Sequence, residues 1–285
     1  YRQAQLAAAE RDPRATRRLA RRILAIDPAH AGARGLVRSV FYASVESATE
    51  LEVYPGAYAQ RLAVGETVTA SVFPGARWSA TMIYEYRRRF ATNNQRFAVR
   101  GDWRVNERLS ILGLVRAGVV EVVPLLTALA EARVDQRGWV LGGRYVYDRM
   151  PWPGELHRAQ AMVGAPLGRG LRVDAEGFLG VLRGCDEVRP VWGARGRLAW
   201  SGRRWELGGG GGYGLEADRG TTAALVDDPC VGTTRDLVEL EVVAGGLDVQ
   251  RRFGPRWSAR VGYGLELRPA SVRVHLASLA VRAWF

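Results

Sequence analysis

The final ten residues, "LASLAVRAWF" (276–285), alternate between two kinds of side chain and end on a phenylalanine. Counting back from the terminus, one face carries only apolar residues: Ala277, Leu279, Val281 and Ala283. The opposite face is mixed and includes Arg282 and Trp284. A period of two indicates a β-strand, so this stretch predicts a strand whose two faces meet different surroundings.

The same period of two recurs from about residue 41 to the end of the chain. In "RWSARVGYGLEL" (256–267), one face is wholly apolar and the other carries glycine, serine and charged residues. The segments "WSATMIYEYR" (78–87), "WVLGGRYVYD" (139–148) and "VWGARGRLAW" (191–200) show a similar alternation. Many short alternating runs separated by turn residues are typical of a β-barrel or a β-sandwich.

Short, mostly charged turns separate these runs at regular intervals. They are "FPGARW", "VNERL", "DQRGW", "LGRGL", "SGRRW" and "FGPRW", centred near residues 75, 106, 136, 168, 202 and 254. Successive centres lie 31, 30, 32, 34 and 52 residues apart, so each interval holds two strands and one longer loop. Short turns at one end and longer loops at the other are typical of a transmembrane β-barrel.

The tryptophans favour the membrane barrel over a soluble sandwich. Seven of the nine lie beside a short turn or at the chain end: Trp78, Trp103, Trp139, Trp200, Trp205, Trp257 and Trp284. If neighbouring strands are antiparallel, all seven lie at one rim, whereas core tryptophans would be scattered along the strands. Such a belt is typical of a membrane interface. We therefore predict an all-β transmembrane antiparallel β-barrel over residues 39–285, located in the cell outer membrane.

The number of strands follows from the turns. Six short turns, with one further strand at each end of the region, give 14 strands. Twelve strands remain an alternative if residues 41–72 do not form two full strands. The sheet must close, because an open edge in lipid leaves backbone groups without hydrogen bonds. An even number places both ends of the barrel on the periplasmic side.

Residues 1–38 have a different character. They are rich in alanine and arginine, and Leu19, Ile23 and Leu24 fall at helical spacing. We predict a short α-helical segment that lies in the periplasm. This segment holds nine arginines and three acids, which is half of the net charge of +12, so the basic balance does not indicate a nucleic-acid partner. The chain begins at Tyr1 without methionine, and we expect that a signal peptide has been removed.

Several of these segments together resemble a known family. "ARRILAIDPAHAGARGLV" (20–37) resembles the end of a tetratricopeptide repeat, and the last strand with Phe285 resembles the carboxy-terminal signal of outer-membrane proteins. A short helical repeat before a barrel with tryptophan-rich turns resembles the YaiO-like outer-membrane barrels and, more distantly, the barrels of exopolysaccharide exporters. The resemblance implies insertion by the barrel assembly machinery, with outer-membrane lipid, polysaccharide and periplasmic export proteins as candidate partners. The exporters carry many helical repeats, whereas fewer than two are present here.

No set of residues predicts an enzyme, and no cofactor or metal site is predicted. His157 lies near Glu155 and Asp148 in the sequence, but no serine or cysteine nucleophile is close by. His275 falls on the predicted lipid-facing side of the last strand, and His30 lies in a helical turn where a capping role is expected. The glycine-rich run at 207–216 lacks the Gly-Lys-Ser/Thr ending of a phosphate-binding loop, which favours a structural role in a strand.

The polar faces of the predicted strands bring charged residues into the lumen. Candidate lumen-lining residues for binding or transport are Arg87, Arg100, Arg116, Arg144, Arg172, Arg195, Arg197, Arg260, Glu176 and Glu266. One interpretation is a lumen filled by arginine–carboxylate pairs. The other is a water-filled, mildly basic conduit for anions. A barrel of 12 to 14 strands is wider than the eight-stranded kind that side chains can fill, so some open space is expected.

The chain has two cysteines, Cys185 and Cys230, and both fall in predicted outer loops. An oxidising compartment favours their pairing, so we predict a disulfide between them.

The function hypothesis is an integral outer-membrane channel or export component, for polysaccharide or other anionic solutes. Two alternatives stay open: a structural or assembly protein without transport, and an outer-membrane lipid-modifying enzyme.

Overall fold

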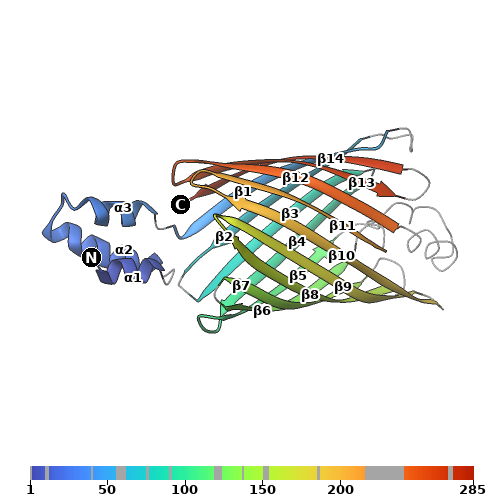
Figure 1. Cartoon of the computed structure of the whole chain (residues 1–285), viewed down its shortest axis with the longest axis horizontal. Coiled ribbons are helices and arrows are strands. Elements are labelled where there is room, and N and C mark those ends of the chain that lie inside the picture. The colour runs from blue at the N-terminus through green and yellow to red at the C-terminus, as the bar shows by residue number, and fades with distance from the viewer. Residues whose placement is uncertain are drawn as a thin grey trace.

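The computed structural model is a closed, antiparallel β-barrel of 14 strands preceded by three helices (Figure 1). It confirms the predicted fold class and the upper of the two predicted strand numbers. The structure describes residues 2–9, 13–39, 41–55, 62–74, 77–89, 92–118, 124–136, 138–149, 154–184, 187–215, 241–268 and 272–285.

The elements follow the order expected from the turns. The helices are α1 (Arg2–Ala9), α2 (Pro13–Ile26) and α3 (Ala31–Ser39). The strands are β1 (Ala43–Val53), β2 (Leu62–Val72), β3 (Trp78–Arg89), β4 (Thr92–Arg104), β5 (Leu109–Gly118), β6 (Leu126–Gln136), β7 (Trp139–Arg149), β8 (Gly154–Gly168), β9 (Leu171–Gly184), β10 (Glu187–Ser201), β11 (Trp205–Leu215), β12 (Glu241–Phe253), β13 (Trp257–Arg268) and β14 (Val272–Trp284).

Each strand pairs with its neighbours in the sequence, and β1 pairs with β14 to close the barrel. The closing register runs from Ser44 opposite Trp284 to Val53 opposite His275. Beyond it, the carbonyl oxygen of Phe285 accepts hydrogen bonds from the backbone of Tyr42 and Ala43. Closure gives each of the described strands a partner on both edges, which is what a sheet surrounded by lipid requires.

Alternation along the strands separates an apolar outer surface from a polar interior. Large apolar side chains at outward positions are strongly exposed, as for Met82 (69%), Leu179 (71%) and Leu247 (70%). Exposure of this kind over a whole barrel matches a lipid-facing surface. Inward positions of the same strands carry most of the ion pairs described below.

The predicted tryptophan belt lies at the end of the barrel where the short turns connect the strands. Trp78 and Trp103 face each other across β3 and β4, and Trp139, Trp205 and Trp257 begin their strands. All five are about half exposed. Trp284 faces the opposite way, as its position beside Arg282 in the sequence predicts, and its ring lies 5.8 Å from the Arg282 guanidinium.

The three helices pack on one another around alanines and lie beyond the end of the barrel where the chain terminates (Figure 1). Ala4, Ala20 and Ala33 are fully buried between the helices. His30 caps α3, because its Nδ1 accepts a hydrogen bond from the backbone N–H of Ala33 at 3.1 Å. Arg17 of α2 lies 4.9 Å above the ring of Tyr42, which links the helices to the start of the barrel.

None of the helices in the described part of the chain is long and apolar enough to cross a membrane.

Candidate functional site: the barrel lumen

A cavity of about 1040 Å³ occupies the barrel interior. Residues from strands on every side line it, including β1, β3, β6 to β10 and β11 to β14. On β13 the lining runs from Arg260 to Arg268, which is about 26 Å along a strand. The cavity is therefore elongated in the direction that a solute would travel through the barrel.

The cavity brings together eight of the ten charged residues proposed from the sequence. They are Arg87, Arg144, Arg172, Arg195, Arg197, Arg260, Glu176 and Glu266. The other two do not line it. Arg100 binds Asp102 with two side-chain nitrogens, and Arg116 pairs with Glu85 at 3.1 Å. Both lie at inward positions of their strands, within the ion-pair network on the wall of the lumen.

Several charged residues of the cavity were not predicted from the sequence, among them Glu50, Glu52, Arg133 and Asp248. Arg133 belongs to "LTALAEARVDQ" (126–136), in which Thr127, Leu129 and Glu131 share its face. That alternation is the signal that could have found it. Glu50 and Glu52 both pair with Arg87, so the lumen position of Arg87 predicts theirs once β1 is recognised.

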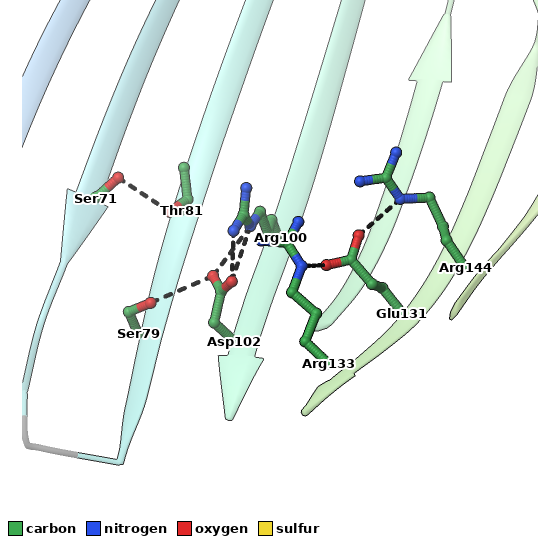
Figure 2. Close-up of polar contacts among 8 residues, drawn as sticks. All are labelled: Ser71, Ser79, Thr81, Arg100, Asp102, Glu131, Arg133 and Arg144. Carbon is green, nitrogen blue, oxygen red and sulfur yellow. Dashed lines mark hydrogen bonds and ion pairs between the residues drawn. The ribbon is translucent and has the colours of Figure 1, made fainter. Parts of the chain in front are cut away.

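A buried carboxylate between two arginines forms one wall of the lumen (Figure 2). The Glu131 side chain is 2% exposed and contacts the guanidinium groups of Arg133 and Arg144. Arg144 donates from Nε to Glu131 at 2.6 Å and from a terminal nitrogen to Gln160 at 3.1 Å. Two guanidinium groups on one carboxylate leave one surplus positive charge at this point.

The same stoichiometry occurs at two further carboxylates of the described interior. Glu85 pairs with Arg96 and Arg116. Glu46 pairs with Arg282 at 2.5 Å and lies 3.8 Å from Arg260. Among the residues that line the cavity itself, eight arginines face six carboxylates, a surplus of two positive charges. Glu131 and Glu46, which pair with three of these arginines, lie outside the lining.

The exposure of the side chains also affects which charges a solute in the lumen meets. Arg133, Arg197 and Arg260 each expose 40–45% of their side chains. The carboxylates that they contact, Glu131, Asp248 and Glu46, expose only 2–24%. The order is reversed at Arg87–Glu50 and Arg268–Glu266, where the carboxylate is the more exposed partner. At the three pairs with the covered acids, an ion inside the lumen meets the guanidinium group first.

The glycine-rich strand β11 explains how two of these arginines are held. The ion pair between Arg197 of β10 and Asp248 of β12 (2.7 Å) crosses the strand that lies between them. A Cβ atom at Gly208 would collide with the Arg197 guanidinium, and one at Gly212 would approach the Arg195 side chain. The bare backbone of β11 therefore lets both arginines lie along the wall, in agreement with the predicted structural role of the run.

This packing predicts a specific loss of stability. A Cβ atom at Gly210 would collide with the carbonyl oxygen of Gly196 on the neighbouring strand, whereas one at Gly113 would meet nothing within 4 Å. We expect Gly210→Ala to destabilise the barrel by about 1–3 kcal/mol, and Gly113→Ala to change its stability by less than about 0.5 kcal/mol. The stability of each variant is measured as the temperature at which the folded barrel loses its heat-modifiable mobility on gels. Equal stability of the two variants would contradict the packing argument.

The histidines of the barrel lie on its outer surface, away from the lumen. His157 contacts the Tyr145 hydroxyl at 2.6 Å, and His275 contacts the Tyr263 hydroxyl at 2.7 Å. Asp148, which the sequence places near His157, faces the interior and binds Thr127 and Arg158. Asp148 therefore does not orient the His157 ring, because the two side chains project from opposite faces of the sheet. Cys185 and Cys230 lie outside the described residues, so their disulfide remains a prediction.

No protein-family model matches the chain, and no curated protein matches its sequence. Solved structures match it over most of its length. A bacterial polysaccharide outer membrane secretin is 13% identical with a TM-score of 0.53, covering 86% of this chain and 98% of the other. The CymD monoaromatic hydrocarbon channel is 8% identical with a TM-score of 0.52, covering 90% and 93%. The outer membrane protein Omp33 of Acinetobacter baumannii is 10% identical with a TM-score of 0.50, covering 86% and 98%. The chain thus has the fold of an outer-membrane β-barrel.

Proposed function

We propose that this protein is an integral outer-membrane channel whose lumen favours anions. The observation that carries the proposal is the elongated cavity of about 1040 Å³, in which Arg133, Arg197 and Arg260 are exposed and their carboxylate partners are more covered. Rings of positive side chains select anions, because a dehydrating anion is stabilised by them and a cation is not. A 14-stranded barrel is also wider than the size at which side chains alone fill the interior.

The leading cargo is an acidic polysaccharide, with smaller anions such as phosphates as the broader class. Guanidinium groups suit carboxylates and phosphates because their planar donors bind two oxygens at once. Exposed arginines occur at several heights of the cavity, from Arg172 near one end of β9 to Arg195 and Arg197 in the middle of β10. A polymer could exchange contacts from one arginine to the next as it moves. One of the matched structures is described as a polysaccharide secretin, which is consistent with this cargo.

We further propose that the helices lie in the periplasm and that the chain is related to the YaiO-like barrels. The helices are next to the chain terminus, at the end of the barrel that has the short turns (Figure 1). In outer-membrane barrels the short turns are periplasmic. In this position the helices can meet periplasmic export proteins, and Phe285 can meet the barrel assembly machinery.

The purified full chain in a planar bilayer tests the channel. We expect discrete conductance steps and, in a salt gradient, a reversal potential of the sign that anion preference gives. An acidic oligosaccharide such as oligogalacturonate should block the current at lower concentration than a neutral oligosaccharide of equal length. A chain that inserts but conducts no ions would favour the structural or assembly role, and equal block by both sugars would remove the acidic cargo.

Orientation gives a separate prediction. With the short turns in the periplasm, a cysteine introduced at Ala223, in the long connection before β12, should react with an impermeant maleimide on intact cells. A cysteine at Ala76, in the short connection after β2, should react only after the outer membrane is permeabilised. Reaction of intact cells at Ala76 alone would show that the barrel has the opposite orientation.

A further inference from the structure

A compact group of polar side chains lies on the outside of the barrel, at the ends of β7, β8 and β9 that are farthest from the tryptophan belt. In one cross-strand row, Glu155 of β8 stands between Arg149 of β7 and Arg183 of β9. In the next row, Tyr147 stands beside His157. All of these side chains project outward, because they occupy the same alternate positions as the exposed apolar residues Tyr145 and Leu179.

Among the described residues of this group, the one carboxylate is that of Glu155, and it is hydrogen-bonded within the group. The Tyr147 hydroxyl donates to Glu155 Oε1 at 2.8 Å, and His157 Nε2 lies 3.6 Å from Glu155 Oε2. The other ring nitrogen of His157 is engaged by Tyr145. Arg149 and Arg183 are both exposed, and neither forms an ion pair with any side chain that the structure describes. Two exposed guanidinium groups therefore flank a single described carboxylate, on which Arg149 acts electrostatically.

Arg149 and Arg183 differ in their ion pairs from the arginines of the lumen. Every arginine that lines the cavity has a carboxylate partner within 4.0 Å. Arg149 and Arg183 lie next to the apolar lipid-facing surface, and neither has a described carboxylate within that distance. Among the described side chains, two guanidinium groups beside one carboxylate leave one positive charge in excess, which an anionic group from outside the chain can neutralise.

The height of the pair on the barrel indicates what that group is. Arg149 is ten residues from Trp139 on the same strand, about 33 Å along it. At a tilt of about 40° the two lie about 25 Å apart along the barrel axis, which is the height of the apolar band of such barrels. If the tryptophan belt marks one membrane interface, Arg149 and Arg183 lie at headgroup level in the other leaflet.

We propose that Arg149 and Arg183 bind a phosphate of a phosphorylated glycolipid in the outer leaflet. Their Cα atoms stand two strand spacings apart, about 10 Å, so two arginine side chains can converge on one phosphate. A phosphomonoester accepts charge-assisted hydrogen bonds from both. Tyr145 and His157 present an aromatic and polar surface directly below, where the sugar of the headgroup meets the acyl chains. The site is independent of conduction through the lumen and rests only on the proposed orientation.

The test uses the full chain in detergent micelles, with lipid binding followed by native mass spectrometry. The probe is bisphosphorylated lipid A, compared with dephosphorylated lipid A and with phosphatidylglycerol. For the Arg149→Gln/Arg183→Gln variant, the apparent Kd for bisphosphorylated lipid A should rise roughly tenfold or more, since two charge-assisted contacts are lost. Binding of dephosphorylated lipid A should be weak in both proteins and unchanged by the substitutions.

A matched double variant distinguishes a built site from a diffuse ring of charge. Arg88 and Arg273 are also exposed, outward-facing and near the same end of the barrel, but each is a lone arginine with Asn93 or Leu267 beside it. Arg88→Gln/Arg273→Gln should leave the apparent Kd within about threefold of the unmodified chain. An equal loss in the two double variants would overturn the site, and equally tight binding of phosphatidylglycerol would overturn the glycolipid as its occupant.

Discussion

Replacing Phe285 with alanine is expected to reduce the amount of barrel assembled in the outer membrane roughly tenfold or more. If this loss came from a less stable folded barrel, the free energy of unfolding would have to fall by about 1.4 kcal/mol. The folded barrel does not supply that energy through the ring. The Phe285 side chain is 62% exposed. The contacts that hold the residue are backbone hydrogen bonds to Tyr42 and Ala43, and alanine keeps them. A large loss would therefore show that the ring is read during assembly.

Two measurements separate assembly from stability. The first is the heat-modifiable barrel recovered in the outer-membrane fraction of cells; the second is the unfolding of material refolded in detergent, which should change by less than about 1 kcal/mol. Phe253→Ala is the matched control, because Phe253 is 53% exposed and ends β12 at the same rim. If both variants assemble normally, Phe285 is not an insertion signal. A soluble, detergent-independent Phe285→Ala protein would contradict the membrane barrel itself.

The barrel could be predicted from the sequence because its strands are nearly regular. A period of two, short turns at intervals of about 30 residues over most of the chain and a tryptophan beside five of the six turns all repeat, so an error in one strand does not spread to the next. The facing of Trp284 followed from alternation alone, and the structure agrees with it. The alternative of 12 strands arose because residues 41–72 carry a weaker pattern, and β1 and β2 nevertheless form full strands there.

The candidate site was less predictable because it depends on which residues meet across the barrel wall. Arg197 and Asp248 are 51 residues apart and pair across an intervening glycine strand, which no local pattern indicates. Asp148 and His157 are close in the sequence, yet the register sets His157 opposite Tyr147, so Asp148 projects from the other face. Alternation assigns a face to each side chain; only the register and the side-chain conformations determine its partners and exposure.

If the protein is the anion channel proposed above, the exposure of Arg197 and Arg260 beside more covered carboxylates predicts how its selectivity responds to mutation. Arg195, Arg197 and Arg260 line the cavity with 40–46% of their side chains exposed. Changing all three to glutamine converts the lining from a surplus of two positive charges to one negative charge, while keeping hydrogen-bonding side chains of similar length. If each exposed guanidinium contributes about 0.5 kcal/mol to the attraction of a permeant anion, the ratio of anion to cation permeability should fall roughly tenfold.

Reversal potentials in a salt gradient measure this ratio for the full chain in planar bilayers. The matched control changes three exposed arginines of α2, Arg18, Arg21 and Arg22, to glutamine. It removes the same charge from the protein but none from the cavity lining, so selectivity should stay within about twofold of the unmodified chain. A lumen variant that keeps its anion preference would show that the paired arginines are electrically neutral to a passing ion. Loss of preference in both variants would assign the selectivity to the overall charge of the protein and not to the arginines of the lumen.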